Sequence, residues 1–247
     1  MNKIAIIGGG SWATALVKII QEDPNNEVFW WMRNQESVDH IIKYNHNPKY
    51  ISSATINNQN VKPSCDINLC IQSATIVVLA IPSAFLNDAM KDIDVNLLQN
   101  KTIFSAIKGI VPEHNLIIAE YLNTIYSVDI TNIGVISGPC HAEEVALEKL
   151  SYLTISCTDS SKASAFAKIL NCRYLKTSTS DDIYGTEYSA VLKNVFAVAS
   201  GIVHALGYGD NFHAVLISNA IQEIERFVNA VHPIQRDIKS SAYLGDL

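Results

Sequence analysis

Over its first 180 residues the chain alternates short apolar runs with segments of helical periodicity. Continuous apolar runs of this length are typical of parallel strands that are buried on both faces. They fall at residues 3–7, 28–32, 75–80, 102–106, 132–136, 152–157 and 173–177. Helical patterns lie between most of them, including 35–44, 113–126, 142–150 and 162–170. The alternation predicts an α/β fold built on a doubly wound parallel sheet.

The pattern changes after about residue 180, where we expect no further strand. Two long helices are predicted instead, at residues 186–206 and 212–231, with a glycine-rich break between them. The first of these is apolar on nearly every side, so we expect it to be buried. We therefore divide the chain into a sheet domain, residues 1–180, and a smaller helical domain, residues 181–247.

The first predicted strand runs directly into a glycine-rich turn that opens a helix, Gly8-Gly9-Gly10-Ser11-Trp12-Ala13. In such a G-x-G-x-x-A pattern the first glycine permits a tight turn and the second lets a pyrophosphate approach the backbone. The exposed N–H groups at the helix start can then hold phosphates. The pattern predicts a dinucleotide site, and the alternative is a glycine-rich turn with no ligand.

Several other small or charged residues directly follow predicted strands. They are Arg33, Pro82-Ser83, Lys108-Gly109 and Gly138-Pro139. In an open α/β sheet the ligand binds at the carboxyl ends of the strands, so we expect these residues to share one edge with the glycine turn. Arg33 stands where NAD-specific folds carry an acidic residue, and an arginine there can meet the 2′-phosphate of NADP or stack on adenine. The sequence is therefore compatible with either NAD(H) or NADP(H) as cofactor. The alternative is that Arg33 is a solvated surface residue without a ligand.

Lys193 lies in the middle of the apolar helix at 186–206. A lysine is almost never fully buried without a partner or a task. Burial lowers the pKa of an ammonium group toward the range in which it can exchange a proton during chemistry. Lys193 is thus a candidate acid/base, and the alternative is a side chain that snorkels to the surface.

Composition narrows the class of protein. The 247 residues carry a formal net charge of −6, without a Lys/Arg cluster, which argues against a nucleic-acid surface. Five cysteines without a CxxC pair indicate free thiols and no zinc site. We expect no signal peptide and no membrane span, because no apolar run approaches ~20 residues. These features predict a soluble cytoplasmic protein without a metal.

Together the motifs resemble one family, the bacterial NAD(P)-dependent glycerol-3-phosphate dehydrogenases. The segments that carry the resemblance are GGGSWATAL at 8–16, WMRN at 31–34, IPSAF at 81–85, SAIKGI at 105–110, SGPCHAEEVA at 137–146, LKNVFAVASGIVHALGYGDN at 192–211 and YLGDL at 243–247. The resemblance implies a Rossmann-like domain and an all-helical domain with the active site between them. It also implies reduction of dihydroxyacetone phosphate to sn-glycerol 3-phosphate by NAD(P)H, or the reverse, which supplies phospholipid synthesis.

The resemblance also implies roles for individual residues. Lys193 would be the general acid/base, with Lys108 and Asp246 as further catalytic residues. The cofactor would be held by Gly8, Gly10, Ser11, Trp12, Arg33, Pro82, Lys108 and Ala142. The phosphorylated substrate would meet Lys108, Gly138, Cys140, Lys193 and Asp246. We also expect a homodimer.

The sequence departs from the family pattern at three places. Cys140 stands where we expect Ser or Thr, and His141 where an aromatic residue is usual. The family continues past Gly-Asp-Leu to a Ser-Arg-Asn segment that grips the substrate phosphate, and the sequence ends before it. We therefore describe the helical domain as truncated relative to the family, and in this form we expect weakened phosphate binding.

Two other functions remain open at the level of the sequence. One is a relative of the same architecture with another substrate, such as a β-hydroxyacid or ketopantoate-type dehydrogenase. The SAIKG and GPCHAEE segments argue against this reading. The other is a dinucleotide-binding protein without catalytic activity.

Overall fold

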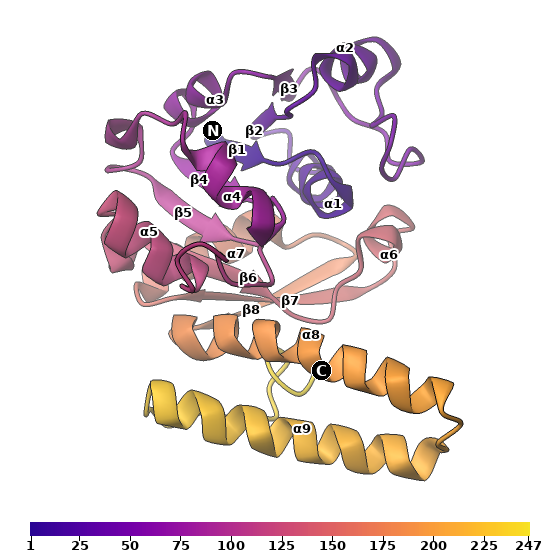
Figure 1. Ribbon diagram of the computed structural model, residues 1–247. Helices are drawn as coiled ribbons and strands as arrows, with labels where there is room; N and C mark the ends of the chain where they lie inside the picture. The colour runs from indigo at the N-terminus through magenta and orange to yellow at the C-terminus, as the bar shows by residue number, and fades with distance from the viewer.

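The computed structural model describes residues 1–247 and contains one eight-stranded sheet with helices on both faces and a helical pair beneath it (Figure 1). The strands are β1 (Asn2–Ile7), β2 (Asn26–Trp31), β3 (Val61–Ser64), β4 (Ile76–Leu79), β5 (Thr102–Ser105), β6 (Ile133–Ser137), β7 (Ser151–Cys157) and β8 (Leu175–Ser180). The helices are α1 (Ser11–Ile20), α2 (Gln35–Tyr44), α3 (Ile67–Ser73), α4 (Ser83–Met90), α5 (Ile118–Tyr126), α6 (Ala142–Ala146), α7 (Ser160–Leu170), α8 (Ile183–Ala205) and α9 (Asp210–Val231). Short 3₁₀ turns lie at Val95–Leu97 and Ile130–Asn132.

The strand order is β3-β2-β1-β4-β5-β6-β7-β8, and the first six strands are parallel. This confirms the predicted Rossmann-like, doubly wound architecture. The sheet differs from the prediction at its end, where β7 pairs antiparallel to β6 and β8 pairs parallel to β7. The connection from β6 to β7 contains only the five-residue helix α6, too little for a crossover to the far end of the sheet. β7 therefore starts at the edge where β6 ends.

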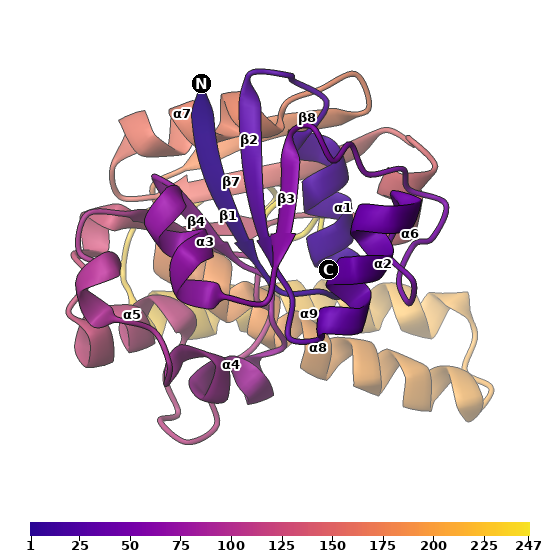
Figure 2. The ribbon, with the colours of Figure 1, turned by 90° about the horizontal axis from the view of Figure 1, so that it is seen from above.

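Both faces of the sheet are covered, which explains why the strands read as continuous apolar runs (Figure 2). Side chains alternate along β1, where Ile4 and Ile6 join one core and Ala5 and Ile7 join the other. The first core packs against α1 and α7, and includes Phe104 stacked on Phe166 with ring centroids 4.1 Å apart. The second core packs against α3 and α5.

Two predicted helices are shorter than the sequence suggests. The segment at 113–126 becomes helical only from Ile118, because Val111 and Leu116 first close a tight bridge. The segment at 142–150 ends its helix at Ala146. The polar stretch at 45–70, which shows little periodicity, supplies the edge strand β3 and the start of α3.

The two long helices α8 and α9 lie side by side below the sheet (Figure 1). The prediction that the first is buried throughout is wrong. Its buried residues all lie between Ile183 and Ala190, where the helix meets the sheet domain. Farther along, Val195, Val198, Ile202 and Leu206 are 57–69% exposed. None of the helices combines the length and the apolar character that crossing a bilayer requires.

A buried carboxyl group links α8 to the sheet domain. Glu187, on the second turn of α8, is 3% exposed, and its Oε2 accepts a hydrogen bond of 3.0 Å from the N–H of Ala119. Ala119 lies in the first turn of α5, whose N–H groups have no partner within the helix. Burial raises the pKa of Glu187 to about 8. Glu187 therefore caps a helix of the sheet domain from a helix outside it.

This contact predicts a pH-dependent stability. Between pH ~4.3, the ordinary pKa of glutamate, and its folded-state pKa of about 8, the folded chain retains a proton that the unfolded chain has lost. The free energy of unfolding should fall as pH rises through this window, by up to ~1.4 kcal/mol per pH unit from this one group. Glu187→Gln should remove that part of the slope in urea titrations at several pH values. Glu223→Gln, on the exposed face of α9, should retain it, and an unchanged slope in Glu187→Gln would contradict the assignment.

Candidate functional site

The glycine turn lies between β1 and α1, with Gly10 as the residue before the first turn of the helix. Gly8 has φ +141°, and a Cβ there would lie 2.2 Å from the carbonyl oxygen of Ala80. Only glycine fits this position without strain. Gly10 is different, because a Cβ there would meet no protein atom within 4 Å. The turn thus holds open space above Gly10, as close approach of a ligand to the backbone requires.

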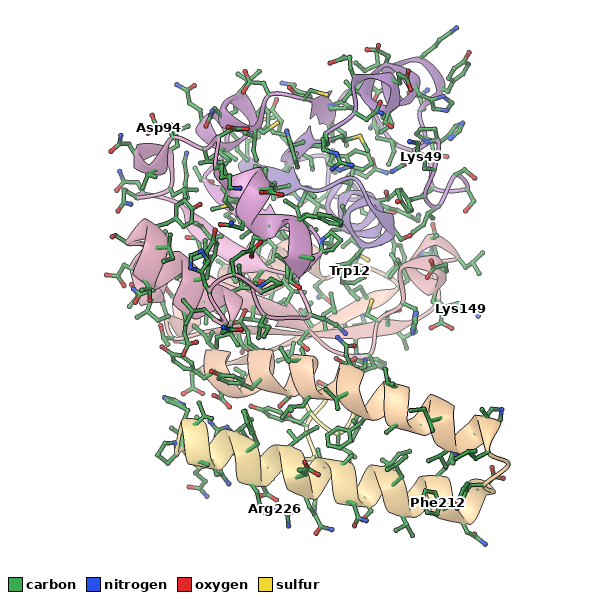
Figure 3. All side chains as sticks on the ribbon, viewed as in Figure 1. Trp12, Lys49, Asp94, Lys149, Phe212 and Arg226 are labelled. Atoms are coloured by element: carbon green, nitrogen blue, oxygen red, sulfur yellow. The ribbon has the colours of Figure 1, made fainter.

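Two adjoining cavities run along this edge of the sheet. The larger, of about 730 Å³, is bounded by Gly8, Gly10, Arg33 and Pro82, among others. The second, of about 480 Å³, is lined by Gly10, Ser11, Trp12, Pro82, Lys108, Cys140 and Ala142, among others. Both share Gly10 and Pro82, so they form one continuous crevice. Trp12, at the start of α1, lies toward the side of the sheet domain that faces α8 (Figure 3).

Two lysines share one buried carboxylate beside this crevice. Lys108 follows β5, Lys193 lies in α8, and Asp246 lies in the segment after α9. Lys108 Nζ is 3.0 Å from Asp246 Oδ2, and Lys193 Nζ is 2.5 Å from Asp246 Oδ1. The Asp246 side chain is 3% exposed, whereas the lysines are 32% and 26% exposed. The carboxylate is therefore enclosed, and the two ammonium groups retain access to the outside.

The surroundings of Lys108 act on its charge in opposite directions. Burial lowers the pKa of Lys108 and outweighs the attraction of Asp246, and the neighbouring Lys193 lowers it further. Lys108 lines the second cavity, and Asp246 joins it to Lys193. The two ammonium groups and the carboxylate between them therefore form one charged cluster beside that cavity.

Further contacts fix the cluster to the sheet edge. Ser137, at the end of β6, places its hydroxyl 3.4 Å from Asp246 Oδ2. Asn194 donates a hydrogen bond of 3.2 Å from Nδ2 to the backbone oxygen of Lys108. Consecutive residues of α8 are therefore linked to Lys108, Asn194 directly and Lys193 through Asp246.

The turn after β6 contributes to the wall of the second cavity. Gly138 has φ +129°, and a Cβ there would lie 2.9 Å from the backbone oxygen of Tyr152. Gly138 does not line the cavity, whereas Cys140, His141 and Ala142 do. Burial raises the pKa of the Cys140 thiol to about 11, so at neutral pH it is a weak hydrogen-bond donor and not a thiolate.

Several residues at the crevice were not predicted from the sequence. Lys49, Tyr50 and Phe85 also line the larger cavity. Asn47 is 1% exposed and donates from Nδ2 to the backbone oxygen of Gly9, at 3.1 Å, and to Thr14 Oγ1, at 2.9 Å. Asn47 thereby fixes the glycine turn from the polar stretch that follows α2. Its only signal in the sequence is the abundance of asparagine in that stretch.

Comparison with known proteins gives consistent matches over nearly the whole chain. Residues 3–163 match the family model for the N-terminus of NAD-dependent glycerol-3-phosphate dehydrogenase, and residues 182–247 match the model for its C-terminus. A glycerol-3-phosphate dehydrogenase [NAD(P)+] of Staphylococcus epidermidis is 34% identical over 92% of the chain and 68% of the relative. The crystal structure of glycerol-3-phosphate dehydrogenase from Coxiella burnetii superposes with a TM-score of 0.86 at 27% identity, covering 98% of this chain and 73% of that one. The chain thus spans about two thirds of the length of its curated relative.

The two glycines offer a test of the crevice as a dinucleotide site. Gly10→Ala adds a methyl group into open space, at φ −83° and ψ −175°, so the fold should persist. The methyl group should nevertheless obstruct a pyrophosphate and weaken NADH binding by about tenfold or more. Gly8→Ala should lose both binding and thermal stability, because its methyl group meets Ala80. Fluorescence titration with NADH and thermal melts separate the two effects, and wild-type affinity in Gly10→Ala would contradict the site.

Proposed function

The chain belongs to the NAD-dependent glycerol-3-phosphate dehydrogenase family, and from this premise we propose that it interconverts dihydroxyacetone phosphate and sn-glycerol 3-phosphate. NAD(P)H is the cofactor that the family implies. The observation that carries the proposal is the pair of lysines on Asp246 beside a crevice that begins at the glycine turn. The same reaction accounts for a supply of glycerol 3-phosphate to phospholipid synthesis.

The residues along the crevice fit a dinucleotide. Gly10 provides the open backbone, and the N–H groups at the start of α1, at Ser11 and Trp12, would hold the phosphates of a bound dinucleotide. Arg33 lines the larger cavity, where it would contact the adenosine end. Further along, Gly8, Pro82, Lys108 and Ala142 complete the proposed contacts. The cavity at Lys108 is then the place for the nicotinamide and the substrate.

When bound, the reduced nicotinamide supplies a hydride to the substrate carbonyl carbon. Negative charge then develops on the carbonyl oxygen, and the chain must stabilise and protonate it. We assign the proton to Lys193 and electrostatic stabilisation of the oxygen to Lys108, which lines the cavity and whose charged form Asp246 favours. Asp246 keeps both cations in place before the substrate arrives, which avoids reorganisation during the reaction.

The substrate contacts follow from the same geometry. Cys140 lines the second cavity, and its neutral thiol can replace a hydroxyl as a weak donor. Gly138 acts through the backbone turn that places Cys140.

We further propose a domain division at residues 1–180 and 181–247, since the last strand ends at Ser180 and α8 begins at Ile183. A homodimer in the cytoplasm completes the proposal, and five free cysteines are compatible with a reducing compartment.

Lys193→Met tests the assignment of the acid/base. The substitution keeps an unbranched side chain of similar length but removes the ammonium group, so kcat for reduction of dihydroxyacetone phosphate should fall by about 10²-fold or more. NADH binding should change little, because the residues assigned to the cofactor are untouched. The control is Lys168→Met, which removes an exposed lysine from α7. Turnover is followed by NAD(P)H absorbance, and near-normal kcat in Lys193→Met would rule out the assignment.

A further inference from the structure

A second buried ion pair lies at the start of α8, away from the crevice. Asp182 is the N-cap of α8, and its Oδ1 accepts a hydrogen bond of 2.9 Å from the N–H of Gly185. The guanidinium group of Arg236 meets both carboxylate oxygens of Asp182, at 2.5 Å from Nε to Oδ2 and 3.3 Å from Nη2 to Oδ1. The Tyr243 hydroxyl donates to Oδ2 of the same carboxylate at 2.6 Å. We call Asp182, Arg236 and Tyr243 the tail anchor.

The tail anchor is enclosed as completely as the core. The side chains of Arg236 and Asp182 are 3% and 4% exposed, and Tyr243 is buried. A charged pair at such a position is stable only when its remaining hydrogen-bonding groups are satisfied. Here Arg236 also donates to the backbone oxygen of His232, at 2.6 Å, and to Asn229 Oδ1, at 2.8 Å. Burial acts to raise the pKa of Asp182, but Arg236 and Tyr243 outweigh it and hold that pKa below its ordinary value.

One residue connects the tail anchor to the carboxylate between the lysines. The backbone oxygen of Tyr243 accepts hydrogen bonds of 3.2 Å from the N–H groups of both Asp246 and Leu247. The turn between them is tight, because a Cβ on Gly245 would lie 2.8 Å from Cα of Ser241. Ser241 itself is hydrogen-bonded through Oγ to Thr154 Oγ1 of β7, at 2.9 Å. The side chain of Tyr243 thus binds Asp182 of the tail anchor, while its backbone oxygen is hydrogen-bonded to the N–H of Asp246.

The path of the chain shows why Asp246 depends on such a link. After α9 the chain returns toward α8 as an irregular segment, residues 232–247, and its end lies beside the middle of α8 (Figure 1). No regular helix or strand fixes this segment. Its side chains make hydrogen bonds to the start of α8 and to β7 through Arg236, Tyr243 and Ser241, besides the contacts of Asp246 itself, and Ala242 is also buried.

We propose that the tail anchor is a positioning device that holds the Asp246 carboxylate between Lys108 and Lys193. With the anchor intact, the two ammonium groups share one enclosed negative charge. With the anchor broken, residues 232–247 lose the contacts of Arg236 and Tyr243 with Asp182, and the two cations face each other with Asp246 less firmly placed between them. The consequence for catalysis rests on the proposed dehydrogenase function, whereas the consequence for the charge of the lysines does not.

The pKa of Lys108 in a titration depends on the groups that surround its ammonium group. Asp246 and Lys193 are in direct contact with it, and Cys140, His141 and Glu143 line the same cavity. Of the contacting pair, only Asp246 favours the charged form of Lys108, whereas burial and Lys193 both disfavour it. Withdrawal of Asp246 should therefore lower the pKa of Lys108.

Tyr243→Phe is the decisive variant, because it removes one hydroxyl group and keeps the buried ring. The lysines would be labelled with ¹³C at Cε and titrated by NMR, with Lys108→Arg and Lys193→Arg used to assign their signals. We expect the pKa of Lys108 to fall by about one unit in Tyr243→Phe and further in Arg236→Gln. Tyr208→Phe, which removes an exposed hydroxyl from the break between α8 and α9, should leave the pKa of Lys108 as in the wild type.

Kinetics form the second arm of the experiment. If the chain reduces dihydroxyacetone phosphate, Tyr243→Phe should lower kcat several-fold and leave the affinity for NADH unchanged. Absence of turnover in the wild type would refute the proposed function and leave the NMR result to decide on the anchor. Wild-type titration of Lys108 in a folded Tyr243→Phe would overturn the proposal, whether or not Arg236→Gln folds.

Discussion

The carboxylate of Asp246 joins two ammonium groups that would otherwise repel each other. Lys108 comes from the edge of the sheet and Lys193 from a helix outside it, and nothing else between them carries negative charge in direct contact with both. The carboxylate is enclosed while the lysines retain access to the outside. The attraction between opposite charges is much stronger in a buried environment than in water, so the one carboxylate can fix the position of α8 relative to the end of β5. The chemistry that we propose depends on that relation.

The scaffold explains why these residues meet. Parallel strands place their carboxyl ends at one edge, and the glycine turn, Pro82 and Lys108 follow neighbouring strands there. Two buried carboxyl groups then link the helical pair to its surroundings, one to the sheet domain and one to the segment after α9. Glu187 caps α5 of the sheet domain, and Asp182 holds Arg236 and Tyr243 of the tail. The cofactor crevice and the proton-transferring groups thus come from different elements, and buried polar contacts fix the positions of these elements relative to one another.

Much of this arrangement could be predicted from the sequence because it depends on local patterns. Apolar runs indicated the strands, and the spacing of Gly8 and Gly10 indicated the turn above the crevice. Lys193 stood out as a charge within an apolar helix, whereas Asp246 came only from resemblance to a family. The reversal of β7 and β8 was not predicted, since it depends on how little helix lies between β6 and β7. The exposure of Val195 and Ile202 was missed because an apolar pattern does not show what packs against it. Contacts such as Glu187 to Ala119 and Asp182 to Arg236 span more than 50 residues, beyond any periodicity.

The central claim is that one carboxylate holds both lysines and favours the charged form of Lys108. Competitive acetylation followed by mass spectrometry measures the reactivity of each lysine across pH, and so its fraction of free amine, without requiring turnover. In a comparison of the wild type with Asp246→Asn, we predict that Lys108 becomes more reactive near neutral pH while exposed lysines such as Lys168 stay the same. Unchanged reactivity of Lys108 in a folded Asp246→Asn variant would contradict the claim.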